Sequence, residues 1–135
     1  MTRSDILAKF DEFGILPTPQ RLKIAEILLA KPQHLSADQI IDLLRCSGSS
    51  VSKATVYNTL NLFGQRGLVK ELCVDRGRRF YDSETRLHHH FYNVDTGELT
   101  DIDDSEISFR QLPELPEGTR GQSVEVLIRV RGTRD

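Results

Sequence analysis

Residues 51–69 read VSKATVYNTLNLFGQRGLV, and this stretch decides the fold class of the first half of the chain. Val56, Leu60 and Phe63 recur at helical spacing, so a helix would place all three on one apolar stripe. Ser52 stands before the pattern as a candidate N-cap, and glycines close it. The stretch therefore predicts one helix that packs its apolar side on a core and leaves its other side open.

The open side of this predicted helix carries residue types that recognise DNA: Lys53, Thr55, Tyr57, Asn58 and Asn61. Lysine binds phosphates, the tyrosine ring and the threonine methyl contact thymine methyls, and amide side chains pair with base edges. The pattern alone leaves a second interpretation open, in which these are exposed polar residues of an ordinary helical domain.

The elements on either side of this helix complete a fold. Residues 2–14, 16–30 and 34–45 each combine a capping residue with apolar residues at helical spacing, which predicts three more helices. Residues 68–74 and 78–82 predict two strands around a tight turn. Helices followed by a hairpin, in this order, favour a winged helix-turn-helix.

Arginines stand where such a fold would contact phosphates. Arg21 lies at the start of the second predicted helix, and Arg76 and Arg78, beside Arg79, form the tip of the predicted hairpin. A basic wing suits the phosphate backbone or the minor groove. We therefore add Arg21, Arg76 and Arg78 to the candidate DNA-binding residues.

The second half of the chain begins after a polar linker, residues 83–86. It predicts a hairpin around the turn DTG, a short helix and a final alternating strand. The apolar face of that strand consists of Val124, Val126, Ile128 and Val130. Because about fifty residues make a thin core, we expect a second copy of the chain to help stabilise this part. The prediction is an α+β chain, with a DNA-binding domain over residues 1–82 and a dimerisation and ligand-sensing domain over residues 87–135.

The charge of the chain is divided between these halves. The net charge is −2, but residues 1–81 hold 12 Lys and Arg against 8 Asp and Glu, whereas residues 82–135 hold 6 against 12. A basic half suits a polyanion, and an acidic half can collect cations.

Composition excludes several classes of protein. With 38% hydrophobic and 28% charged residues the chain is ordinary for a globular protein. No stretch resembles a bilayer span or a signal-peptide core, so we expect a cytoplasmic protein with no membrane partner. Cys46 and Cys73 do not form a CxxC pair, which excludes a disulfide framework and a cysteine-rich zinc site.

Three of the four histidines are consecutive, in the segment LHHHFYNVDTG, residues 87–97. On an extended strand side chains alternate, so His88 and His90 would point one way and His89 the other. A His-x-His pair converges on one point and is a common start of a metal site. On spacing alone, a solvated histidine loop is the alternative.

Further ligands for such a site are available in the sequence. They are the carboxylates of Asp82, Asp101, Asp103, Asp104 and Glu106, and the remaining histidine, His34. Imidazole nitrogens with one or two carboxylates form an N/O site that suits Fe(II), Mn(II) or Zn(II).

Four segments together resemble the ferric uptake regulator (Fur) superfamily of metal-responsive repressors. They are TPQRLKIAEILL (18–29), HLSADQI (34–40), residues 51–69, and the His-x-His pair followed by FYNVDTGELTDI (91–102). They follow that family's order and spacing over nearly the whole chain. The resemblance implies an N-terminal winged-helix DNA-binding domain, a small C-terminal α/β dimerisation domain and a regulatory metal between them.

The resemblance also implies particular ligands. Carried over residue by residue, the regulatory site falls on His34, His88, His90 and Asp101, with a carboxylate expected just after the wing, at Asp82 beside Tyr81. A second family site falls near His89 and Glu106. The chain departs from the family where a CxxC pair binds structural zinc, because Asn93 and Thr96 occupy those positions. We therefore expect no four-cysteine zinc site and a dimer held by packing alone.

Within the superfamily, the segment RFYDSETRLHHHFYNVDTGELTDID (79–103) is similar to the iron response regulator (Irr) branch. The triple histidine is associated with haem in that branch, and this implies His88, His89 and His90 as haem ligands. Imidazole is a known axial ligand of haem iron.

The sequence thus predicts a homodimeric transcription regulator of iron and haem homeostasis genes, not an enzyme. It would bind a palindromic DNA operator with one winged helix per half-site. The alternative within the family is a metal-activated or peroxide-sensing repressor with an N/O metal site. A small metalloenzyme is the alternative from another class, but an enzyme has no use for a basic winged helix.

Overall fold

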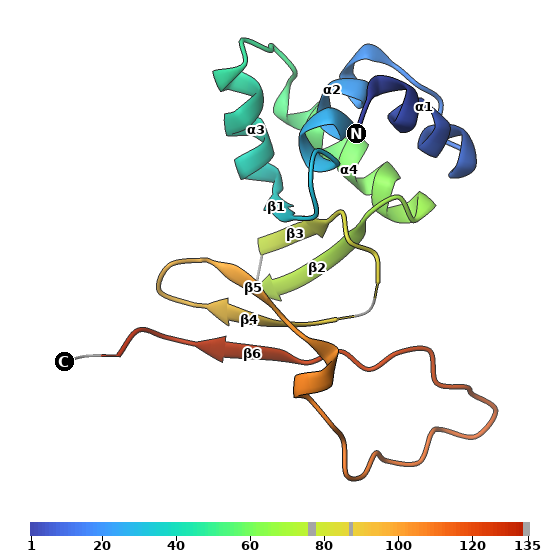
Figure 1. Cartoon of the computed structure of the whole chain (residues 1–135), viewed down its shortest axis with the longest axis vertical. Coiled ribbons are helices and arrows are strands. Elements are labelled where there is room, and N and C mark those ends of the chain that lie inside the picture. The colour runs from blue at the N-terminus through green and yellow to red at the C-terminus, as the bar shows by residue number, and fades with distance from the viewer. Residues whose placement is uncertain (76–77, 87, 134–135) are drawn as a thin grey trace. The chain divides into compact units, whose positions relative to one another are not determined.

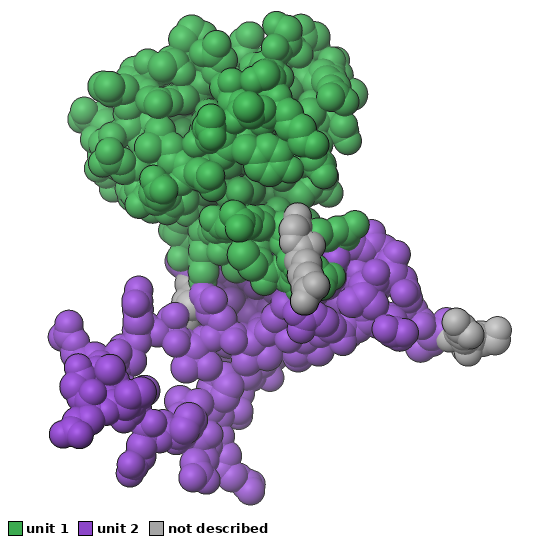
Figure 2. Space-filling view, turned by 180° about the vertical axis from the view of Figure 1, so that it is seen from behind, with its two compact units in different colours: residues 1–85 green, residues 86–135 purple. Residues whose placement is uncertain are grey.

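The computed structural model describes residues 1–75, 78–86 and 88–133 (Figure 1). The chain divides into two compact units, residues 1–85 (unit 1) and residues 86–135 (unit 2), which Figure 2 shows in different colours. None of its described helices has both the length and the apolar composition needed to span a bilayer.

Unit 1 begins with helices that each start behind a capping side chain. The helices are α1 (Arg3–Glu12), α2 (Pro19–Leu28), α3 (Ala37–Cys46) and α4 (Lys53–Arg66) (Figure 1). Their N-caps are Thr2, Thr18, Ser36 and Ser52. Each cap oxygen accepts a main-chain N–H from the first helical turn, which otherwise has no partner. Gly67 ends α4 in the left-handed region at φ 85°, where glycine fits without strain.

The wing of unit 1 is an antiparallel sheet with the strand order β1-β3-β2. The strands are β1 (His34–Ser36), β2 (Lys70–Asp75) and β3 (Arg78–Asp82). The predicted hairpin is therefore β2 and β3, and the third strand lies just before α3. The tip that carries Arg76 falls outside the described residues.

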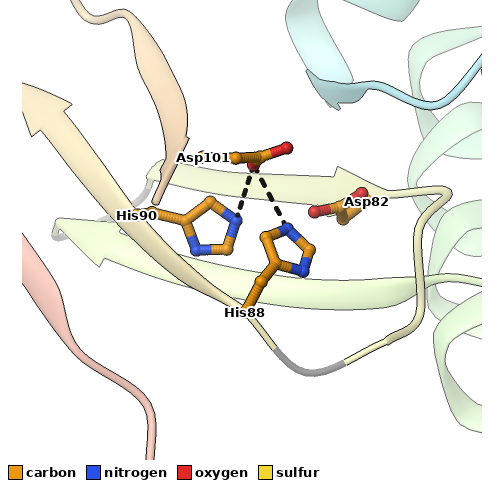
Figure 3. Close-up of side chains that lie close together, drawn as sticks. All are labelled: Asp82, His88, His90 and Asp101. Carbon is orange, nitrogen blue, oxygen red and sulfur yellow. Dashed lines mark ion pairs between the residues drawn. The ribbon is translucent and has the colours of Figure 1, made fainter. Parts of the chain in front are cut away.

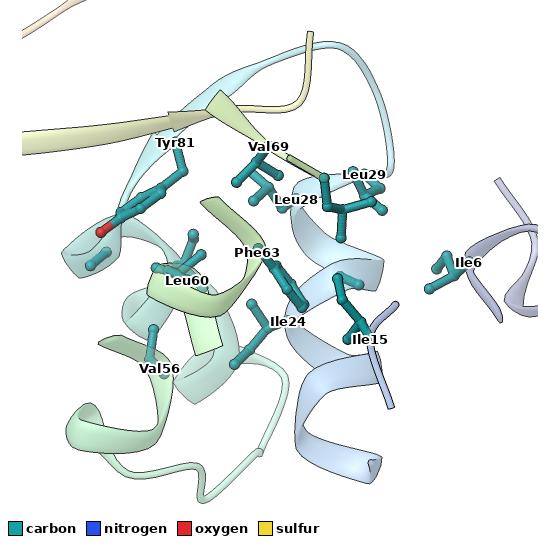
Figure 4. Packing of buried hydrophobic residues seen from close by; sticks show 14 of the residues in the cluster. Ile6, Ile15, Ile24, Leu28, Leu29, Val56, Leu60, Phe63, Val69 and Tyr81 are labelled. Carbon is teal, nitrogen blue, oxygen red and sulfur yellow. The ribbon is translucent and has the colours of Figure 1, made fainter. Parts of the chain in front are cut away.

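The core of unit 1 is apolar and draws on all four helices and the wing (Figure 4). Val56, Leu60 and Phe63 are fully buried, which confirms the stripe predicted for α4. The Phe63 ring packs on that of Phe10 in α1, with a centroid separation of 5.6 Å. Four helices and a three-stranded wing around one core confirm the winged-helix prediction.

Unit 2 is built on a sheet with the strand order β5-β4-β6. Its elements are β4 (His89–Asn93), β5 (Leu99–Ile102), the 3-10 turn η1 (Asp104–Glu106) and β6 (Leu127–Val130). The hairpin β4–β5 is antiparallel and turns at Gly97, as the DTG motif predicts, and β6 pairs with β4 in parallel.

Two features of unit 2 differ from the prediction. The short predicted helix is reduced to η1, and the backbone is already extended at Ile107. The final strand is shorter than its alternating pattern, since only Leu127–Val130 is assigned to it. Its apolar side is open within unit 2, with Ile128 38% exposed and Val130 37% exposed.

Candidate metal centre

Three side chains of unit 2 converge on one point: His88, His90 and Asp101 (Figure 3). His90 lies in β4 and His88 directly precedes that strand, so alternation along the chain turns both side chains to one side. The register of the β4–β5 hairpin sets Asp101 directly opposite His90. The Nε2 atoms of His88 and His90 lie 3.2 Å and 3.3 Å from the same oxygen, Asp101 Oδ1.

These distances suit a shared metal ion. Atoms that bind one Zn(II), Fe(II) or Mn(II) ion at about 2.0–2.2 Å lie roughly 3.0–3.5 Å from each other. The candidate ligand atoms lie within 4.8 Å of one another, and the His90 side chain is buried while that of His88 is only 13% exposed. Two imidazole nitrogens and a carboxylate oxygen form an N/O donor set, which favours Fe(II), Mn(II) or Zn(II) over softer metals.

The orientation of the His88 ring gives a further reason to place a cation there. Its Nδ1 lies 2.7 Å from the main-chain carbonyl oxygen of Arg86, which can only accept, so Nδ1 is the donor. In the neutral ring, Nε2 then carries a lone pair and faces the Asp101 carboxylate. Because two acceptors repel each other, a metal ion bound between these two atoms would stabilise the arrangement. No sequence pattern predicted that the Arg86 carbonyl would orient the His88 ring.

Unit 1 carries the other two predicted ligands on neighbouring strands. His34 and Asp82 are direct partners in the β1–β3 register, so their side chains leave the sheet on the same face. The ends of these strands are fastened together, since Gln33 N–H donates to Ser83 Oγ at 3.0 Å and Ser83 N–H donates to the Gln33 carbonyl at 3.0 Å. The Asp82 carboxylate, also labelled in Figure 3, is buried and accepts the Glu84 N–H at 2.8 Å.

Tyr81, the neighbour of Asp82, has a different role. Its side chain belongs to the apolar core of unit 1. Burial raises the pKa of its phenol, and the Glu71 carboxylate raises it further, so the phenol stays protonated. Tyr81 therefore is a core residue, which leaves Asp82 as the carboxylate that follows the wing.

His89 lies on the opposite side of β4 from the other two histidines. Its side chain is 2% exposed, and its nitrogens face the Val126 N–H and the Asp104 carboxylate. Glu106, the second residue expected near it, is exposed in η1. Neither Val126 nor Asp104 was singled out as its partner from the sequence, since both contacts depend on long-range packing.

The predicted DNA-binding residues lie on α4 and at the start of α2. Lys53, Tyr57, Asn58 and Asn61 are exposed and Thr55 is half-buried. Arg21 lines one groove together with Thr55, Asn58 and Asn61. Its guanidinium lies at the N-terminal end of α2, where Nη1 donates to the Leu16 carbonyl at 2.7 Å. Arg78 is exposed at the start of β3, whereas Arg76 lies outside the described residues.

Comparisons with known proteins agree with this architecture. The ferric uptake regulator family matches residues 12–128. The peroxide-responsive repressor PerR of Staphylococcus aureus is 32% identical over 111 residues, covering 82% of this chain and 70% of that protein. The ferric uptake regulator from Pseudomonas aeruginosa, solved with manganese, has a TM-score of 0.74 at 30% identity and covers 99% of this chain and 100% of its own. The Vibrio cholerae ferric uptake regulator has a TM-score of 0.74 at 25% identity, with coverages of 93% and 98%.

The similarities support the family but do not single out its Irr branch, which stays a prediction. The same relatives make the metalloenzyme alternative wrong. The chain belongs to the ferric uptake regulator family, whose members are metal-responsive transcription regulators and not enzymes.

Proposed function

We propose that this chain is an iron-responsive regulator that binds palindromic operator DNA as a homodimer and senses a divalent metal through its N/O cluster. The observation that carries the proposal is the convergence of two imidazole Nε2 atoms on one carboxylate oxygen, at 3.2 Å and 3.3 Å. The fixed ring of His88 supports it, because its second nitrogen is already used by a carbonyl.

The proposed site draws ligands from both units. Unit 2 supplies His88, His90 and Asp101, and we propose that unit 1 completes the shell with Asp82 and His34. A bound divalent metal would bring two positive charges, which the two carboxylates would balance, while the three imidazoles would supply neutral nitrogen ligands. A site completed in this way would make metal binding favour one arrangement of the DNA-binding unit relative to its partner's.

The DNA-binding half of the proposal rests on α4. Its exposed Tyr57, Asn58 and Asn61 can reach base edges in a major groove, while Lys53 and Arg21 meet phosphates. We propose that the open apolar side of β6 pairs two chains, since a symmetric dimer places two recognition helices on a palindrome.

A peroxide-sensing repressor is the second candidate. It is favoured by the N/O donor set together with 32% identity to a peroxide-responsive repressor. Iron held by His88, His90 and Asp101 would supply reactivity toward peroxide, and the peroxide would be the oxidant of a neighbouring imidazole. The test is mass spectrometry of the peptide that holds His88 and His90 after peroxide treatment with Fe(II) or with Mn(II). A gain of oxygen with iron alone would support peroxide sensing, and no gain with either metal would exclude it.

Haem sensing remains a prediction from the resemblance to the Irr branch. It would use His88, His89 and His90, and none of the described contacts favours it over the divalent metal.

The proposed function is tested by an operator titration at fixed salt, after the operator has been selected from random DNA. Binding is measured with metal-free, Mn(II)-loaded and haem-loaded protein, for the wild type and for His90→Ala. We expect Mn(II) to change operator affinity at least tenfold in the wild type and not in His90→Ala, because the variant lacks a ligand. Operator binding that ignores Mn(II) in the wild type would overturn metal sensing, and a response to haem alone would establish the haem alternative.

A further inference from the structure

His89 is the buried histidine that the proposed metal site does not use. Its Nδ1 accepts the main-chain N–H of Val126 at 2.9 Å, and its Nε2 lies 3.4 Å from Asp104 Oδ1. Because a main-chain N–H can only donate, Nδ1 carries the lone pair and the neutral ring has its hydrogen on Nε2, toward the carboxylate. Both nitrogens of the ring therefore have partners inside unit 2.

The partners of His89 lie at the two ends of one long segment. Residues 108–125, between η1 and β6, form no helix or strand and are exposed throughout (Figure 1). Asp104 and Phe109 stand where the segment begins, and the Phe109 ring meets the His89 ring edge-on at a centroid distance of 6.2 Å. Val126 stands where it ends, directly before β6.

Both main-chain polar groups of Val126 form hydrogen bonds with β4. Its N–H donates to the His89 side chain, and its carbonyl accepts the His90 N–H at 3.1 Å. The strand β6 is an edge strand of four residues that pairs with β4 in parallel. These two hydrogen bonds of Val126 therefore determine where the open apolar side of β6 begins.

We infer that His89 is a positioning residue: it holds the two ends of the segment 108–125 close to each other and fixes β6 against β4. It acts through hydrogen bonds and ring packing. The side chain of His90, a proposed metal ligand, leaves β4 on the opposite face. This inference rests on the proposed function in one respect, namely that β6 pairs two chains.

The chemistry of the ring offers matched variants. Asn places a carbonyl oxygen near the position of Nδ1, so His89→Asn can still accept the Val126 N–H. Leu fills a similar volume with no acceptor, so His89→Leu leaves that N–H without its partner. His88→Ala is the complementary control, because it removes a proposed metal ligand and leaves His89 in place.

The experiment is hydrogen exchange on the full chain, without metal, followed by Mn(II) titration of the same samples by calorimetry. We expect His89→Leu to speed exchange in residues 126–130 by about tenfold, the equivalent of one net hydrogen bond, and His89→Asn to restore most of the protection. Both variants should keep Mn(II) affinity within about threefold, well under the effect of losing a ligand. His88→Ala should instead weaken Mn(II) binding and leave the exchange rates of residues 126–130 unchanged.

Three results would overturn the inference. Unchanged exchange in residues 126–130 of His89→Leu would show that the ring does not hold β6. Loss of protection across β4 and β5 as well, with no recovery in His89→Asn, would make His89 a general core residue. Loss of Mn(II) binding in both His89 variants as in His88→Ala would make His89 a ligand. If the wild type binds no Mn(II), the proposed function fails, while the exchange comparison still decides the role of His89.

Discussion

The two units of this chain are stabilised in different ways. Unit 1 buries apolar side chains from four capped helices and from its wing in one core. The described part of unit 2 buries five side chains, and two of these are the imidazoles of His89 and His90 beside Tyr92, Leu99 and Ile102. Unit 1 is therefore held by its own hydrophobic packing, whereas unit 2 leaves the apolar side of β6 open and uses polar groups inside. So thin a core is expected to open locally at a lower free energy than the core of unit 1.

The largest effect should come from the core of unit 1. Phe63→Ala removes a fully buried ring, so we expect it to lower the free energy of unfolding by about 3–5 kcal/mol. The matched change in unit 2 is Phe109→Ala, where the ring is 45% exposed and the loss should stay below about 1 kcal/mol. Urea denaturation followed by circular dichroism measures both. Equal losses would show that the units do not differ in this way.

The next effect tests the open side of unit 2. Ile128→Glu places a charge on the exposed side of β6, and burial of that charge between two chains would weaken dimerisation by about 2–4 kcal/mol. Leu43→Glu, on the exposed side of α3 in unit 1, is the control that should leave the dimer intact. Analytical ultracentrifugation with a chelator present measures the dissociation constant. Reversible conversion of the wild type to monomers by the chelator alone would mean that a metal holds the dimer.

A smaller effect distinguishes base recognition from simple charge. Tyr57→Ala removes an exposed ring from α4, and we expect a loss of about 1–3 kcal/mol on the selected operator and little loss on random DNA. Arg78→Ala should instead weaken binding to both DNAs and reduce the salt dependence. Fluorescence anisotropy at several salt concentrations measures these losses. A Tyr57→Ala loss of the same size on both DNAs would remove this residue from base recognition.

The capping of unit 1 should give an effect of about 1 kcal/mol. Ser36 Oγ accepts the Gln39 N–H at 3.2 Å, so Ser36→Ala leaves that first-turn N–H of α3 without its partner. The second bond of the capping box, from the Ser36 N–H to the Gln39 side chain at 2.8 Å, uses a main-chain donor that alanine keeps. Thermal denaturation measures the loss, with Ser36→Thr as the control that keeps an oxygen acceptor. No difference between the two variants would show that α3 is held by packing alone.

The smallest effect depends on pH. The Thr2 N–H donates to the Asp5 carboxylate at 2.9 Å and, with the Thr2 hydroxyl, lowers the pKa of Asp5 below its usual 3.8. Because the folded pKa is lowered, this contribution is present above the unfolded value and is lost as the pH falls through the folded one. Asp5→Asn should flatten the acid limb of the stability curve slightly, because it removes the carboxyl whose pKa is lowered in the folded chain. Denaturation series between pH 5 and pH 2, a range of about three units around the carboxylate pKa, measure the difference.

Much of unit 1 could be predicted because its signals are local. The stripe of Val56, Leu60 and Phe63 follows from the period of a helix, and the caps of its helices follow from one side chain and the next turn. The alternation of the three histidines is equally local, since it follows from the period of a strand. These features need no knowledge of the remainder of the chain.

The tertiary structure decided which groups these side chains meet. Several acidic residues follow the histidines, and the β4–β5 register brought Asp101 to His88 and His90 while it left Asp104 to His89. The carbonyl of Arg86 and the N–H of Val126 became partners through backbone positions that any residue could occupy. Register between strands is set by packing across the whole sheet, and a shift of one residue would exchange the two faces of β4. The sequence by itself therefore determined which histidines share a face, and only the folded chain decided that one face meets the Asp101 carboxylate and the other meets Val126 and Asp104.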